Sequence, residues 1–146
     1  MFLNELKKNE GITFMQLVKI LADSDNVFAK EEKNLYNDYL KELNINESEI
    51  SESDLSSVCE TLKGSSNRCK NIIYFELIGL ALIDGEYNEE EVELLEKLGE
   101  TLGITRSKRI AFANYFYNFV DVYGFSVVDA ESKIALLKEQ AEKLLA

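Results

Sequence analysis

The chain has 146 residues, enough for one domain, and carries a formal net charge of −11. A negative charge of this size argues against nucleic acid as the main partner, because nucleic-acid binding depends on neutralising phosphates. The chain has no histidine, which excludes histidine-activated nucleophiles and the commonest zinc ligand. The acidic surplus favours cations or a basic patch on another protein as partners.

The chain has no proline and shows no clear alternation of polar and apolar residues, so we predict an all-α protein. Its most apolar stretch, residues 72–83, contains Glu76 and is too short to span a bilayer. We expect Glu76 to sit at the edge of its helix and to reach solvent or an arginine. The alternative is a buried carboxylate that needs a partner or has a raised pKa. Cys59 and Cys69 form no CxxC motif and are interpreted as reduced thiols, with a single disulfide bridge as the alternative. These features predict a cytoplasmic protein without a transmembrane segment.

In chain order, residues 1–9 predict a short helix with Phe2, Leu3 and Leu6 facing inward. Thr13 and Gln16 form a capping-box pattern, which predicts that the first long helix begins there. We expect this helix to end near Asp25 and Asn26, in a turn.

The next predicted helix covers about residues 29–43. Asn44 is expected to stop it, and Ile45 to supply the hydrophobic contact of a Schellman ending. Residues 46–53 are polar and predict a loop. A short helix over 54–63 follows, and Gly64 is expected to end it.

Residues 71–83 are apolar nearly all round, which predicts a central buried helix. Asn88 is expected to cap the helix that follows. Residues 105–123 place five aromatic side chains at helical spacing, which we interpret as core: Phe112, Tyr115, Phe116, Phe119 and Tyr123. We expect Gly124 to end that helix and Ser126 or Val127 to begin the last one.

Part of the chain occurs twice, because residues 22–45 align with residues 81–104 at an offset of 59 positions. The coinciding residues are Ala22/Ala81, Asp25/Asp84, Glu31/Glu90, Glu32/Glu91, Leu35/Leu94, Leu43/Leu102 and Ile45/Ile104. Where the copies differ, glycine stands opposite asparagine, at Asn26/Gly85 and Asn44/Gly103. Both residue types readily take the left-handed conformation that ends a helix.

The duplication predicts a compact bundle of seven or eight helices built from two similar hairpins about a pseudo-twofold axis. We place the first hairpin at 13–45, an inserted helix at 54–63, the second hairpin at 67–104 and the C-terminal helices at 105–145. All belong to one domain, 1–146.

Such an axis would bring together the acidic turns of the two copies, which contain Asp25, Glu32, Asp84 and Glu91. Hard divalent cations prefer several oxygen ligands from more than one segment, so these four residues are candidate metal ligands. The alternative is purely structural. Acids in the first turn of a helix satisfy free amide groups and the helix dipole, and aspartate before glycine or asparagine favours a turn.

The second copy is strongly acidic, with eight acidic residues and one lysine in 81–104. It offers a second functional hypothesis, an adaptor that docks a basic protein partner on this helix. The candidate contacts are Glu86, Glu89, Glu93, Glu96 and Glu100. The alternative is a solvated helix face that only keeps the protein soluble. Arg106, Lys108 and Arg109, just beyond it, are expected to pair with this acidic helix.

The segments ALIDGEYNEEE and ADSDNVFAKEE resemble the TerB-like domain of tellurite-resistance proteins and of some membrane-anchored DnaJ-type co-chaperones. The resemblance covers residues 12–145, and the first copy departs from it in having Asn26 where the pattern has glycine. It implies an all-α bundle of two similar halves and a non-enzymatic role in stress response. It also implies a divalent cation (Ca²⁺, Mg²⁺, Mn²⁺ or Zn²⁺) and a protein partner at the inner membrane surface. The implied metal ligands are Asp25, Glu32, Asp84 and Glu91.

Overall fold

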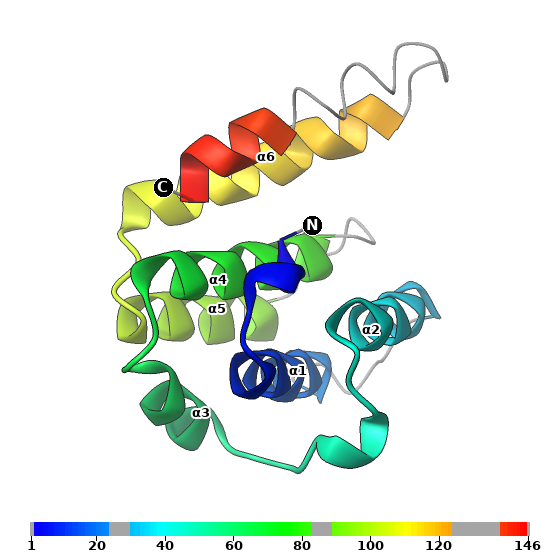
Figure 1. The fold of residues 1–146 in the computed structure, drawn as a ribbon. Coiled ribbons are helices and arrows are strands. Elements are labelled where there is room, and N and C mark those ends of the chain that lie inside the picture. Colours follow the sequence, from blue (N-terminus) through cyan, green and yellow to red (C-terminus); the bar gives the residue numbers. More distant parts are fainter. Residues whose placement is uncertain (1, 24–29, 83–88, 124–137, 146) are drawn as a thin grey trace.

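The computed structural model describes residues 2–23, 30–82, 89–123 and 138–145. Within these ranges every regular element is helical and none is a strand, so the all-α prediction is confirmed. The elements are η1 (Leu3–Glu5), α1 (Lys8–Asp23), α2 (Lys30–Leu43), η2 (Glu47–Glu49), α3 (Leu55–Leu62), α4 (Asn67–Leu82), α5 (Glu89–Thr101) and α6 (Arg106–Tyr123), where η marks a 3₁₀ turn (Figure 1). Residues 138–145 are also helical.

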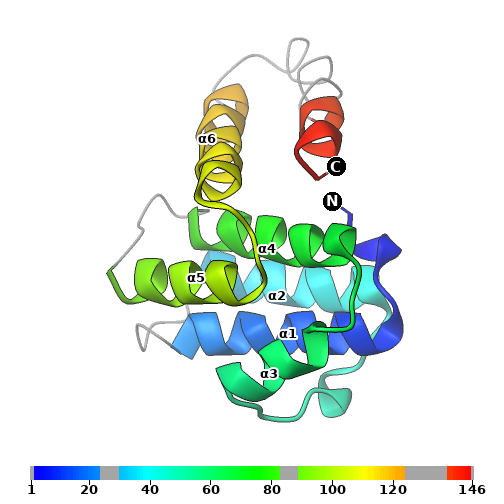
Figure 2. The ribbon, with the colours of Figure 1, turned by 90° about the vertical axis from the view of Figure 1, so that its left-hand side faces the viewer.

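The helices pack in layers around α4. On one side α4 contacts α1, which in turn contacts α2 and α3, and on the other side α4 contacts α6. Figure 2 shows α1, α2, α4 and α5 running along one direction, with α6 and residues 138–145 standing across them. No described helix combines the length and the apolar character needed to cross a membrane.

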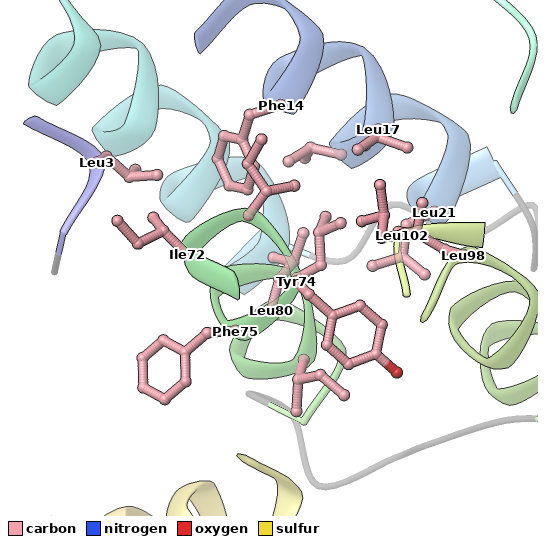
Figure 3. Packing of buried hydrophobic residues seen from close by; sticks show 14 of the residues in the cluster. Leu3, Phe14, Leu17, Leu21, Ile72, Tyr74, Phe75, Leu80, Leu98 and Leu102 are labelled. Atoms are coloured by element: carbon pink, nitrogen blue, oxygen red, sulfur yellow. The ribbon is translucent and has the colours of Figure 1, made fainter. Parts of the chain in front are cut away.

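Helix α4 lies at the centre because its side chains are apolar nearly all round, as the sequence predicted. Figure 3 labels four of its buried apolar side chains, Ile72, Tyr74, Phe75 and Leu80, and the others described are Cys69, Ile73, Leu77, Ile78 and Ala81. The expectation for Glu76 was wrong, since its side chain is buried at 7% exposure. Its Oε1 accepts a hydrogen bond of 3.3 Å from the backbone N–H of Phe2, because η1 folds back over α4.

The first long helix starts five residues earlier than the capping-box pattern predicted. Helix α1 begins at Lys8, and Thr13 lies within it, buried, with its hydroxyl donating to the carbonyl of Asn9. The start is fixed by Glu10, whose Oε1 accepts a 3.0 Å hydrogen bond from the backbone N–H of Lys7. A glutamate at the third helical position reaching back to the residue before the helix is half of a capping box. The first hairpin therefore starts at residue 8, not 13.

The two copies end their second helix in the same way. Asn44 has φ of 55° after α2, and Gly103 has φ of 76° after α5. The amide of Ile45 then donates to Leu40, and the amide of Ile104 donates to Gly99, at 3.0 and 2.9 Å. These bonds are the Schellman pattern, so the ending predicted after Leu43 is confirmed.

The connection after α2 contains the short turn η2, where the sequence predicted a loop. Side chains of η2 hold it to α1 through ion pairs of Glu47 with Lys19 (2.7 Å) and of Glu49 with Lys8 (2.8 Å). Helix α3 follows as predicted, and Asp54 caps it by accepting a 2.7 Å hydrogen bond from the amide of Ser57.

The aromatic side chains of α6 pack on α4, as predicted for a core. The rings of Phe112, Tyr115 and Phe116 lie 5.5, 5.1 and 4.7 Å from the ring of Phe75. Predictions for the side chains of Phe119 and Tyr123, for Gly124 and for the start of the last helix at Ser126 or Val127 lie outside the described residues.

Candidate functional site

The acidic start of α5 is the part of the predicted site that the structure describes best. Glu89, Glu90 and Glu91 form the first turn, where carboxylates are favoured by the free amides and the dipole of the helix. Glu89 and Glu90 are exposed, whereas Glu91 is buried at 6% exposure. A carboxylate is seldom buried to this degree unless other groups stabilise it, so Glu91 is the most constrained acid of the turn.

Of the other three predicted metal ligands, the structure locates only the backbone of Glu32, in the first turn of α2. Its side chain, Asp25 and Asp84 lie outside the described residues, as does Asn88. The helix ends that flank residues 24–29 and 83–88 are described, and their positions can be compared. The last residues of α1 and α4 and the first residues of α2 and α5 lie toward the same side of the molecule, on the left of Figure 2.

Among the described side chains, no group of three or more histidine, cysteine or acidic residues could hold a metal ion. The metal-centre prediction depends on residues of both turns, and the side chains of three of its four ligands, Asp25, Glu32 and Asp84, lie outside the described residues. It therefore stays a prediction.

The outer face of α5 carries the second predicted site. Glu93, Glu96 and Glu100 are exposed there together with Glu89, while Glu86 lies outside the described residues. The opposite side of α5 is buried, through Leu95, Leu98 and Gly99. Within the ranges that the structure covers, no ion pair involves these four exposed glutamates.

We expected Arg106, Lys108 and Arg109 to pair with this acidic face, but among the described residues none of them forms an ion pair with it. Arg109 does reach α5, but its Nη1 donates to the backbone carbonyl of Glu96, at 3.1 Å, and not to a carboxylate. Its aliphatic part packs on Gly99, where an added Cβ would lie 2.6 Å from Cδ of Arg109. The arginine therefore fastens α6 to α5 and leaves the glutamate side chains in solvent.

A polar cluster that the sequence did not reveal joins the starts of α1 and α4. Burial would raise the pKa of Glu10, but hydrogen bonds from the Lys7 amide, Ser65 and Cys69 together lower it. Burial, and next the hydrogen bond to Glu10, raise the pKa of Cys69 to about 12. Cys69 is therefore a protonated thiol at neutral pH and not an activated nucleophile.

Both cysteines are free, as predicted, and both are buried. No sequence signal pointed to the cluster of Glu10 and Cys69, because only the packing of α1 against α4 brings them together.

Over the described residues, these observations define a helical fold in which α5 begins with three glutamates and carries an acidic outer face. Comparisons with protein-family models, with curated proteins and with solved structures found no match. The likeness to TerB-like domains is therefore carried by the sequence segments alone.

Proposed function

We propose that this protein is a non-enzymatic, TerB-like binding module of a stress response, with two hairpins related as copies. It holds a divalent cation through the acidic turns of the two hairpins, with Asp25, Glu32, Asp84 and Glu91 as ligands. The observation that supports this best is the burial of Glu91, on the side of the molecule where α1 and α4 end and α2 and α5 begin. A cation there would offset the repulsion between acids of the two turns.

The metal proposal is tested by calorimetric titration of the purified protein with Ca²⁺, Mg²⁺, Mn²⁺ and Zn²⁺. We expect at least one of them to bind and to raise the melting temperature, because a ligand that binds only the folded state stabilises it. Asp25→Asn and Asp84→Asn should each weaken binding by tenfold or more, roughly the loss of one charged ligand.

Asp38→Asn is the matched control, since Asp38 is exposed on α2 away from the turns and loses the same charge. No heat and no stabilisation with any of the four cations would remove the metal from the proposal. If Asp38→Asn weakened cation binding equally, the effect would reflect overall charge and not the loss of a ligand.

A second candidate function is an adaptor that docks a basic protein, including one at a membrane complex, without any metal. It is favoured by the exposed glutamates of α5, which project from a helix whose other side is buried in the core. Complementary charge would speed association and make it sensitive to salt.

Capture experiments at low and high salt test this candidate. Reversing three charges (Glu93→Lys, Glu96→Lys and Glu100→Lys) should abolish salt-sensitive capture of the partner. The control reverses three exposed glutamates on other elements (Glu52→Lys, Glu60→Lys and Glu139→Lys) and should leave capture intact. Partner capture that survives the α5 reversal would exclude this face.

A further inference from the structure

A cavity lined by positively charged side chains lies between the start of α4 and the turn that joins α5 to α6. Its volume is about 200 Å³. Two lysines on separate helices line it, Lys70 of α4 and Lys108 of α6, together with Asn67, Asn71 and Thr105. Among the residues that the structure describes, no acidic residue lines it, although the chain has 27 acidic against 16 basic residues.

The charges of the two lysines are not neutralised by carboxylates in the part of the chain that the structure describes. Neither lysine takes part in an ion pair there. The Nζ of Lys70 makes one long contact, 3.4 Å to the backbone carbonyl of Lys63. Both side chains are half-buried, so their positions are restricted while their charges remain available to a ligand.

The backbone around the cavity adds donors. Helices α4 and α6 both begin at its wall, and the first amides of a helix have no partner within the helix. The hydroxyl of Thr105 accepts a 3.2 Å hydrogen bond from the amide of Lys108, and that of Ser66 accepts one of 3.1 Å from the amide of Cys69. Of the two amides that precede Cys69 in α4, that of Asn67 belongs to a residue that lines the cavity. The positive ends of both helix dipoles therefore lie beside the cavity.

The cavity is also held in shape and open. The side chain of Asn71 is 6% exposed, and its Nδ2 donates to the carbonyl of Leu145 at 3.2 Å, so the C-terminal segment fixes this wall. Gly103 also lines the cavity, and a Cβ added there would meet no atom within 4 Å.

We propose that this cavity binds a phosphate group, as a free anion or as part of a small molecule or lipid headgroup. Two lysine ammonium groups, side-chain amides and two helix starts match the charge and the acceptor oxygens of a phosphate. The volume is below the roughly 300–1,000 Å³ of pockets for drug-sized ligands, which favours a small anion. The cavity is lined by residues at the start of α4 and just after α5, whereas the end of α4 and the start of α5 lie on the other side of the molecule.

The test is an NMR titration of the intact, isotope-labelled chain with sodium phosphate, compared with sodium chloride at equal ionic strength. We expect phosphate-specific amide shifts concentrated at residues 67–71 and 103–108. The variant Lys70→Gln/Lys108→Gln should lose them. The control Lys33→Gln/Lys138→Gln removes the same charge from exposed positions and should keep them.

The proposal is overturned if phosphate gives no more shift than chloride, if the shifts map elsewhere, or if both double variants lose them alike. Folding of each variant is checked by its amide spectrum. If the first variant fails to fold, Lys108→Gln alone and Lys70→Gln alone should each weaken phosphate binding several-fold. No weakening in either would equally reject the site.

Once free phosphate is seen to bind, a vesicle-pelleting experiment distinguishes a lipid headgroup from a soluble phosphate compound as the ligand. Pelleting with phosphatidylcholine vesicles that contain phosphatidic acid, lost in Lys70→Gln/Lys108→Gln, assigns the ligand to a lipid headgroup. Free phosphate binding without such pelleting assigns it to a soluble molecule.

Discussion

At the scale of single residues, the positions that end α2 and α5 show how backbone conformation selects an amino acid. Asn44 and Gly103 both have positive φ, at 55° and 76°. Glycine takes this conformation without a steric penalty, and asparagine tolerates it better than other residues. The two copies therefore use different residues to make the same turn, which places Ile45 and Ile104 in the core.

We predict that Gly103→Ala destabilises the protein by about 1 kcal/mol, because alanine at positive φ brings its Cβ close to the following carbonyl. The matched control is Gly64→Ala, since neither position has an atom within 4 Å of an added Cβ and only Gly103 has positive φ. Urea unfolding of both variants measures the difference. Equal stabilities would show that the left-handed ending of α5 is not maintained in solution.

At the scale of elements, the contact between α4 and α6 depends on a glycine facing an aromatic ring. A Cβ added at Gly79 would lie 2.7 Å from two ring atoms of Phe116. The same ring lies 4.7 Å, centre to centre, from Phe75 and 5.1 Å from Tyr115, so it has little room to move. The absence of a side chain at residue 79 lets the two helices approach.

We predict that Gly79→Ala destabilises the protein by about 1–3 kcal/mol, the usual cost of overpacking a core. Gly99→Ala is the comparison. Its Cβ would approach Cδ of Arg109 at 2.6 Å, and that long side chain can shift, so the loss should be smaller. Thermal unfolding of both variants tests whether Gly79→Ala loses more stability than Gly99→Ala. A Gly79→Ala protein as stable as wild type would contradict the close approach of α4 and α6.

At the scale of the whole molecule, the start and the end of the chain are joined through α4. Arg68 forms an ion pair of 2.7 Å with Glu5 near the N-terminus and one of 2.8 Å with Glu142 near the C-terminus. Ala141 and Leu145 are fully buried beside them. The helix at residues 138–145 is therefore part of the core and not a loose tail.

These ion pairs predict a pH dependence. The hydrogen bond from Arg68 is the main reason why the pKa of Glu5 is lowered in the folded protein. A lowered pKa contributes stability above the unfolded value, about 4.3, which is lost as the pH falls through the folded value.

Arg68→Gln should cost less than about 1 kcal/mol at pH 7, because the pair is largely exposed. The difference from wild type should shrink below about pH 4 as Glu5 protonates. Urea unfolding of wild type and variant at several pH values measures this difference. The control is Lys63→Gln, which removes an exposed ion pair with Glu60, three residues earlier in the chain. A difference that stays constant down to pH 3 would exclude Glu5 as the partner that matters.

Much of the helical arrangement could be predicted because it is written in local patterns. The stop at Asn44, the cap at Asp54 and the apolar surface of α4 follow from residues close in sequence. The start of α1 could not be predicted as easily, because Lys7 is not a capping residue and Glu10 supplies the cap from within the helix. Of the candidate sites, the exposed glutamates of α5 were predicted, whereas the burial of Glu91 was not.

Local sequence patterns specify the all-α class, most helix boundaries and the acidic character of one helix, because each depends on neighbours within about one helical turn. Contacts between distant segments were established by the three-dimensional fold alone. It placed Glu76 under the amide of Phe2, directed Arg109 to a backbone carbonyl, and set Lys70 and Lys108 around one cavity. The two hydrogen bonds join residues 74 and 13 positions apart, and no local periodicity encodes such contacts.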